Sequence, residues 1–372
     1  MGKPTERPAE ESMTRDDKRY DVVVIPGDGI GPELTEAAVG VLRAVAESGG
    51  FELALTSHEA GASLYRKLGR VMTDETLEAC RRAHGVLKGP VGDPAVRAPD
   101  GTEAGVLGGV LRPALDAYAN IRPIRLYPGV TSALAGRAPG SIDYVVVREN
   151  TEGLYASRGR GFVTEDVTLD TMVITRRGVD RVARRAFAIA RQRSGAPGDR
   201  RRRVTCVDKA NVLRGFAFFR EGVRRVSEEF PDVELENMYA DAAAARLVQD
   251  PGHFDVLVME NFLGDILSDL GGGTIGGLGM CPSGNIGDSA AYFEPIHGSA
   301  PSLAGTDRAN PLSMVLTGAM MLDWLGETES ADRVREAVDG VLADGAIAIR
   351  PDGTVTHGTR AAGQAVIDRL KR

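Results

Sequence analysis

The chain has 372 residues, of which 42% are hydrophobic and 26% are charged, a composition typical of a globular protein with a large core. Its 45 basic and 52 acidic residues give a formal net charge of −7, which argues against a dedicated nucleic-acid-binding protein. Three widely spaced cysteines argue against a disulfide framework, and no apolar run reaches the roughly eighteen residues of a membrane span.

The first residues add an expectation about location. Residues 1–19 are polar and lack the apolar centre of a signal peptide, so we expect a disordered tail there. The few cysteines fit the reducing cytoplasm. We therefore expect a cytoplasmic protein with neither nucleic acid nor a membrane as a partner.

The apolar pattern predicts alternating strands and helices, which is typical of an α/β fold. A strand at 21–25 is followed by a glycine turn and an amphipathic helix at 33–47. Further strands are expected at 85–87, 143–147, 203–207, 233–238 and 254–259. Further helices are expected at 76–83, 179–192, 215–230, 242–249, 265–270, 311–325 and 331–343, with a last one ending at residue 370. The glycine-rich segment 271–289 predicts turns, and the arginine run 200–203 predicts a solvated loop.

Two glycine motifs resemble nucleotide-binding loops without fitting them. Residues 27–31 follow a strand but have the spacing GxGxG. Residues 271–276 have the spacing GxGxxG but follow a helix. A standard Rossmann site requires that spacing directly after a strand, so neither motif supports one.

An acidic pair is more informative. Asp265 and Asp269 are four residues apart in a predicted helix, which places both carboxylates on one face about 5–6 Å apart. Solvated surface acids are one interpretation. A divalent cation with oxygen ligands is the other, and the apolar neighbours and the glycine segment that follows favour it.

Three arginines form a second candidate cluster. Arg112 and Arg122 lie ten residues apart, and Arg148 ends the predicted strand at 143–147, at the edge where α/β proteins bind ligands. Planar guanidinium groups suit carboxylates. Lys209 directly follows another strand and could act as a base, and His297 lies among prolines and glycines; a lone lysine or histidine in such a place more often has a structural role.

Taken together, these segments resemble the β-decarboxylating dehydrogenases of 2-hydroxy acids, the isocitrate/isopropylmalate dehydrogenase family. The resemblance extends from about residue 20 to the end, in order. The matching segments are PGDGIGPE (26–33), LDAYANIRP (115–123), VRENTEGLY (147–155), VDKANVL (207–213), GDILSDL (264–270), PSGNIGD (282–288), FEPIHGSAP (293–301) and ANP (309–311). The form RENTEGLY, with GGLGMCPSGNIGD, looks closest to homoisocitrate dehydrogenase.

The resemblance implies an isopropylmalate/isocitrate dehydrogenase-like fold, with two domains around a shared ten-strand sheet and an active cleft between them. Residues 20–117 and 277–372 would form a discontinuous cofactor-binding domain. Residues 118–276 would form the domain for substrate, metal and dimerisation. The active site would be shared across a homodimer.

The resemblance also implies an activity, NAD(P)- and metal-dependent oxidative decarboxylation of a 3-substituted malate to a 2-oxo acid and CO₂. Tyr155 and Lys209 would be the acid–base pair, Lys209 taking the hydroxyl proton as hydride leaves and Tyr155 protonating the carbon after CO₂ is lost. Mg²⁺ or Mn²⁺ would be bound by Asp241, Asp265 and Asp269. The substrate would contact Arg112, Arg122, Arg148, Gly108, Gly109 and Lys88. The cofactor would contact Glu294, His297, Gly298, Ser299, Ala300, Ser302 and Asn310.

The segment before Arg112 departs from the family. Val106, Gly108 and Gly109 stand where family members carry the side chains that recognise the C3 substituent. We expect either a larger or anionic substituent, such as one ending in a carboxylate or phosphonate with Lys88 or Arg97 supplying charge, or a repacked loop whose glycines serve the backbone. Isopropylmalate, isocitrate and tartrate remain the alternative substrates.

Two further positions differ. NAD-using members carry an aspartate where this chain has Ser302, and NADP-using members often carry a lysine and a tyrosine there. We expect NAD, with NADP as the alternative. Glu260 is an additional acid beside the predicted metal helix, and the sequence assigns it no role; a surface position is one interpretation.

Two other functions compete. A non-catalytic regulatory subunit of the same fold would lack acid–base or metal groups, which this chain keeps. A metal-dependent hydrolase would not need the dinucleotide segment around His297 and Asn310.

Overall fold

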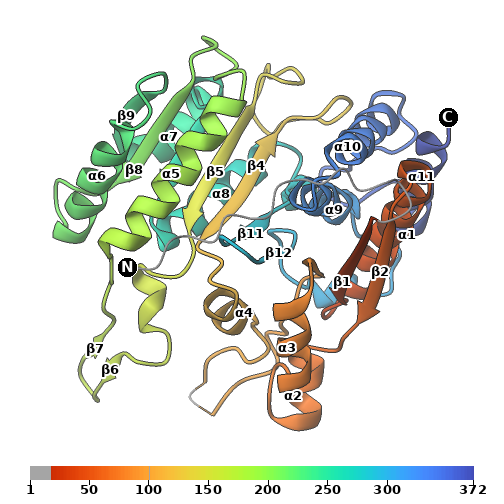
Figure 1. Cartoon of the computed structure of the whole chain (residues 1–372), viewed down its shortest axis with the longest axis horizontal. Coiled ribbons are helices and arrows are strands. Elements are labelled where there is room, and N and C mark those ends of the chain that lie inside the picture. Colours follow the sequence, from red (N-terminus) through yellow and green to blue (C-terminus); the bar gives the residue numbers. More distant parts are fainter. Residues whose placement is uncertain (1–17, 100) are drawn as a thin grey trace.

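The computed structural model of the chain describes residues 18–99 and 101–372 and is mixed α/β. Over these residues ten strands form one sheet in the order β2-β1-β3-β12-β11-β4-β5-β10-β8-β9, which can be followed in Figure 1. The strands are β1 (Arg19–Ile25), β2 (Glu52–Ser57), β3 (Gly85–Lys88), β4 (Ala119–Arg125), β5 (Asp143–Glu149), β8 (Arg203–Asp208), β9 (Glu234–Tyr239), β10 (Val256–Met259), β11 (Gly284–Ile286) and β12 (Ala291–Phe293). The expected α/β class with a large shared sheet is confirmed. The predicted tail lies outside the described residues up to residue 17, and Arg19 already belongs to β1.

Helices cover the sheet, and a small hairpin of β6 (Phe162–Val163) and β7 (Thr168–Leu169) projects away from it (Figure 1). The helices are α1 (Gly31–Gly49), α2 (Ala62–Leu68), α3 (Asp74–Arg82), α4 (Gly108–Ala114), α5 (Arg176–Gln192), α6 (Arg214–Ser227), α7 (Ala240–Gln249), α8 (Asn261–Thr274), α9 (Leu312–Trp324), α10 (Thr328–Ala343) and α11 (Thr359–Leu370). In the described part of the chain, none of them combines the length and apolarity that crossing a membrane requires.

The two ends of the sheet are parallel, and its middle is antiparallel. β10 runs parallel to β5 and β8, whereas β4 is antiparallel to both β5 and β11. In Figure 1, α5 and α6 lie on one face of the β5–β8 half and α7 and α8 on the other. Because both faces are covered, β10 is buried along its whole length and is apolar throughout, unlike a strand with one wet face.

Helix α8 is longer than the sequence predicts. The expected helix covers 265–270 with turns from 271, but α8 continues to Thr274. A Cβ atom on Gly271 would lie 2.4 Å from the Tyr144 hydroxyl oxygen, and one on Gly272 would lie 2.6 Å from Leu278 Cδ2. These glycines let the helix pack closely against its neighbours. The prediction of turns at 271–274 is therefore wrong, since tertiary packing outweighs the low helix propensity of glycine.

The arginine run is only partly a solvated loop. Residues 200–202 are exposed, as expected. Arg203 is buried at the start of β8, and its Nη2 lies 2.8 Å from Asp199 Oδ2 and 3.3 Å from Glu234 Oε2. A solvated position for Arg203 is therefore a wrong prediction, because carboxylates neutralise the charge and permit its burial.

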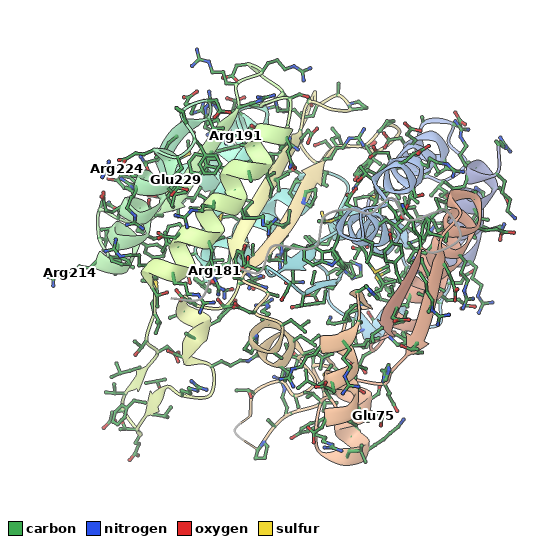
Figure 2. The ribbon with its side chains drawn as sticks, in the orientation of Figure 1. Glu75, Arg181, Arg191, Arg214, Arg224 and Glu229 are labelled. Atoms are coloured by element: carbon green, nitrogen blue, oxygen red, sulfur yellow. The ribbon has the colours of Figure 1, made fainter. Side chains whose placement is uncertain are left out.

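The arginines of α5 and α6 lie on an outer surface. In Figure 2, Arg224 lies at the left edge of the molecule and Arg191 lies on α5. Arg191 pairs with Asp232, and Arg224 Nη2 lies 2.7 Å from Glu221 Oε1. These exposed pairs contribute little to stability.

Candidate active site

Three elements meet where β5 ends. Arg148 is the last residue but one of β5, and it lies opposite Asn120 of the antiparallel strand β4, which also carries Arg122. Helix α8 begins two residues after β10, the other neighbour of β5, and carries Asp265. Side chains that are far apart in the sequence therefore converge at a carboxyl edge of the sheet, where open α/β proteins bind ligands.

The predicted acids and two of the predicted arginines are in contact there. Arg148 forms an ion pair with Asp265, and Arg122 Nη2 lies 3.4 Å from the same Oδ1 oxygen. Arg122 Nη1 lies 3.3 Å from Asp269 Oδ1. Arg148 is only 1% exposed, whereas both carboxylates are partly open to solvent. The guanidinium groups are thus buried, and the carboxylates that they contact are accessible to solvent.

Arg112 joins the cluster from α4. Its Nε lies 3.4 Å from the hydroxyl oxygen of the buried Tyr292. Burial would lower the pKa of Arg112, but the Tyr292 hydroxyl and the charges of Glu294 and Asp265 outweigh it and raise that pKa. Arg112 therefore remains charged within reach of Asp265.

The cluster has an excess of positive charge. Burial, followed by repulsion from Arg112 and Arg122, lowers the pKa of Arg148. Burial alone would raise the pKa of Asp265, but Arg148 and Arg122 outweigh it and lower that pKa. Burial raises the pKa of Asp269, and the charge of Asp265 adds to this. Three guanidinium groups face two carboxylates, so an anionic ligand would relieve the repulsion between the arginines.

Tyr155 contacts Asp265 of this cluster. It belongs to the short 3₁₀ helix η2 (Leu154–Ser157), and its hydroxyl donates to Asp265 Oδ2 over 2.9 Å. Burial and then the charge of Asp265 raise the pKa of Tyr155, so the phenol keeps its proton at neutral pH. Tyr155 is 40% exposed, so a ligand can reach its side chain. Tyr155 can therefore donate a proton to a bound ligand.

Glu260 has a role that the sequence does not reveal. It is 1% exposed, so it does not lie on the surface. One carboxylate oxygen accepts from the backbone N–H groups of Phe262 and Leu263 at 3.0 and 3.3 Å, capping α8. The other accepts from the Leu154 N–H at 2.8 Å. Glu260 thus joins the turn that carries Tyr155 to the helix that carries the aspartates.

Replacing Glu260 with alanine should lower the free energy of unfolding by about 2–3 kcal/mol, because the helix loses its cap and the Leu154 N–H loses its partner. Thermal or denaturant unfolding measures this change. Glu260→Gln keeps one acceptor oxygen and should lose less. As a control, Glu228→Ala removes an exposed glutamate that pairs only across one helix turn and should change stability by less than about 0.5 kcal/mol. Equal losses in both alanine variants would contradict this role.

Lys209 and Asp241 pair with each other outside this cluster. Lys209 follows β8, Asp241 lies in the first turn of α7, and the Lys209 Nζ is 2.8 Å from Asp241 Oδ1. Their side chains are 32% and 70% exposed. Across residues 18–99 and 101–372 no three His, Cys, Asp or Glu side chains are arranged to hold a metal ion. A single chain therefore does not bring Asp241 to Asp265 and Asp269.

A cavity of about 960 Å³ adjoins the glycine-rich end of α8. Of the residues predicted for the cofactor, His297, Gly298, Ala300 and Asn310 line it. Burial lowers the pKa of His297, so the imidazole is neutral at pH 7, and its Nε2 lies 3.0 Å from Ser313 Oγ.

The other predicted cofactor residues lie elsewhere. Ser299 is buried, and its hydroxyl donates to the Gly92 carbonyl over 2.6 Å. Ser302 is exposed and does not line the cavity. Glu294 pairs with Lys88, which is 2% exposed. Lys88 therefore offers no free charge to an anionic substituent, contrary to what the loop sequence suggested.

Three lining segments were missed. They are residues 130–133, residues 349–354, and the glycines at 273, 276 and 277. The glycine motif at 271–276 thus borders a cavity, although it lacks the strand that a Rossmann loop requires. No spacing pattern in the sequence indicates residues 349–354, which lie between α10 and α11.

Buried asparagines also escaped the sequence analysis. Asn120 and Asn150 both donate to Asn285 Oδ1, at 3.0 and 2.9 Å, and the Asn285 amide donates to Glu294 over 3.1 Å. Arg122 donates to Asn120 Oδ1. This chain of hydrogen bonds joins the arginine cluster to Glu294 and fixes both.

Comparison with known proteins agrees with this geometry. The family model described as isocitrate/isopropylmalate dehydrogenase matches residues 21–366. A 3-isopropylmalate dehydrogenase of Salinibacter ruber is 42% identical over 339 residues, which cover 89% of each chain. An isocitrate/homoisocitrate dehydrogenase of Thermus thermophilus is 42% identical over 355 residues, covering 95% of this chain and 99% of that protein.

A solved structure agrees as well. Isocitrate dehydrogenase from Methylococcus capsulatus superposes with a TM-score of 0.83 at 37% identity, covering 95% of this chain and 100% of that one. Relatives named for isopropylmalate and for homoisocitrate are equally similar, so the special closeness to homoisocitrate enzymes is not supported. The match of nearly the whole sequence, and of the fold, shows that this chain is an oxidative decarboxylating dehydrogenase of the isocitrate/isopropylmalate dehydrogenase family.

Proposed function

We propose that this enzyme oxidises and decarboxylates a 3-substituted malate, with NAD as its cofactor and Mg²⁺ or Mn²⁺ as its metal. The observation that carries this proposal is the convergence of Arg122, Arg148 and Tyr155 on Asp265. The buried guanidinium groups can bind the two carboxylates of a substrate. The Asp265 carboxylate and the Tyr155 hydroxyl, a proton donor, lie next to them. A malate presents two carboxylates and a hydroxyl in the matching arrangement.

The residues would act as follows. Arg112, Arg122 and Arg148 hold the substrate carboxylates and fix its orientation. Lys209 takes the proton of the 2-hydroxyl. His297 and Asn310 would hold NAD, which would supply the acceptor for the hydride of C2. After CO₂ has left, Tyr155 gives its proton to the substrate carbon.

The donor set fits a divalent ion. Asp265 and Asp269 present partly exposed carboxylates whose mutual repulsion a cation would relieve, and oxygen ligands suit Mg²⁺ and Mn²⁺. Bound there, the ion would lower the pKa of the substrate hydroxyl. Asp241 would complete the set from a second subunit, since it does not reach the other two within one chain.

We propose a homodimer for the same reason. Lys209 and Asp241 form an exposed unit that would enter the cleft of the partner. Exposed apolar side chains stand on the elements near this unit and on the hairpin, where a partner would cover them: Phe162, Val163, Leu169, Val212, Leu213, Val248, Phe262 and Ile266. Residues 118–276 would form the dimerisation domain, and 20–117 with 277–372 the cofactor domain.

NAD is favoured by an acid in the cavity wall. Asp352 lines it, and a carboxylate there could accept hydrogen bonds from ribose hydroxyls. Arg350 in the same wall favours the alternative, NADP, whose added phosphate would pair with a guanidinium. We expect kcat/KM for NAD to exceed that for NADP; the opposite order, reversed by Arg350→Ala, would assign the enzyme to NADP.

The reaction is tested by following reduced nicotinamide with a panel of 3-substituted malates, including isopropylmalate, isocitrate and homoisocitrate, together with tartrate. Turnover of at least one malate, with CO₂ released in equal amount, is expected. No turnover of any compound with either cofactor and either metal would refute the proposal.

A further inference from the structure

The start of α4 leaves an open place beside two guanidinium groups. A Cβ atom on Gly108 would lie 3.3 Å from Arg112 Cζ. A Cβ atom on Gly109 would have the side chain of Arg158 as its nearest neighbour, 3.8 Å from Nη1 and 4.0 Å from Cδ. Because glycine stands at both positions, no side chain separates these two arginines from the space in front of the helix.

Arg158 approaches this place from the segment that carries Tyr155. It directly follows η2, and its N–H donates to the Tyr155 carbonyl over 3.2 Å. Gly109 and Arg112 are three residues apart in α4, so they share one face of that helix. Arg112 directs its charge toward Asp265 and Glu294. The guanidinium over Gly109 therefore lies beside the arginine cluster.

Arg158 differs from the other arginines of the cleft. Arg122 and Arg148 pair with aspartates, and Arg112 has Tyr292. The Arg158 guanidinium has no hydrogen bond or ion pair with any residue in the described ranges 18–99 and 101–372, and its side chain is exposed. Its guanidinium is therefore a cation without a counter-charge among these residues, beside the arginine cluster.

We propose that Arg158 is a specificity residue that binds an anionic end of the substrate's C3 substituent, over the space left by Gly108 and Gly109. This inference rests on the proposed function. In the proposed complex the buried arginines bind the two malate carboxylates, so a third anionic group of the substrate would pair with Arg158. A carboxylate or a phosphonate fits, since both accept paired N–H donors. A branched apolar group would instead lie against an unneutralised guanidinium and leave the glycine space unfilled.

The test compares kcat/KM for homoisocitrate, whose C3 substituent ends in a carboxylate, with that for 3-isopropylmalate, using Arg158→Ala, Arg158→Lys and wild type. We expect wild type to prefer the charged substrate and Arg158→Ala to lower the ratio of the two constants by roughly 30-fold, mainly through KM. Arg158→Lys should recover part of the ratio, because charge is restored without the planar fork. Arg160→Ala is the matched control, an exposed arginine two residues further on, and it should leave the ratio unchanged.

The outcomes separate this inference from the proposed function. If no malate is turned over, the proposed function fails. If 3-isopropylmalate is preferred and Arg158→Ala leaves the ratio unchanged, the reaction stands and the role of Arg158 is refuted. An equal loss for both substrates in Arg158→Ala would also refute it, because a purely structural effect does not distinguish charged from apolar substituents.

Discussion

Replacing Asp265 with asparagine is expected to lower kcat/KM by roughly a thousand-fold or more. In the structure this carboxylate meets Arg148, Arg122 and Tyr155, and it is a proposed metal ligand. The amide has nearly the same shape but carries no charge. The arginine cluster then loses its main counter-charge, and the metal loses an anionic ligand. Steady-state rates over a range of Mn²⁺ concentrations should show both a lower kcat and a higher metal requirement.

The matched control is Asp368→Asn. Asp368 lies on α11, and its contact is a hydrogen bond from Gln364 on the same helix. This variant should keep wild-type rates and the wild-type metal requirement. Thermal unfolding of both variants excludes loss of the fold as the cause. An Asp265→Asn enzyme with unchanged kcat/KM and unchanged metal dependence would contradict the assignment of the site.

Two inactive variants are expected to restore activity to each other. Lys209→Ala should be nearly inactive as a homodimer, as should Asp265→Asn. If Lys209 serves the cleft of the partner, a heterodimer of the two variants contains one site with both defects and one site with none. Heterodimers purified with two different tags should therefore show about half of the wild-type kcat per dimer.

The contrary result is equally clear. If Lys209 acts in the cleft of its own chain, each site of the heterodimer keeps one defect, and the purified heterodimer stays inactive. A heterodimer of Lys209→Ala with Asp241→Asn provides the control, because both changes then fall on the donated unit and neither cleft receives an intact one. Activity in that control would show that the two residues do not act as a unit.

Much of the fold could be predicted from the sequence because its strands lie in the middle of a covered sheet. β5 and β10 are continuous apolar runs, and α1 carries a regular apolar stripe, so local pattern and final burial agree. β11 and β12 have three residues each, which is too short to show an alternation of apolar and polar residues. The extension of α8 was missed because its glycines serve contacts with residues distant in the sequence.

The site residues also fall into those that the sequence could predict and those that it could not. Helical spacing placed Asp265 and Asp269 together, and a strand end placed Arg148 among them, because these relations are local. The positions of Glu260, Arg158 and Lys88 depend on tertiary contacts. Glu260 accepts hydrogen bonds from two N–H groups at the start of α8 and from the distant Leu154 N–H. The charge of Lys88 is balanced by Glu294, which is 206 residues away in the sequence. Lys209 and Asp241 pair within one chain, but their proposed role depends on a second chain, which no pattern within one sequence specifies.

The most direct test of the central claim is the initial rate of nicotinamide reduction by the wild-type enzyme with its best malate, before EDTA treatment, after it, and after Mn²⁺ is restored. We predict turnover in the first and third conditions and almost none in the second, since a divalent ion held by Asp265 and Asp269 would activate the substrate hydroxyl. An undiminished rate in the metal-stripped enzyme would contradict it.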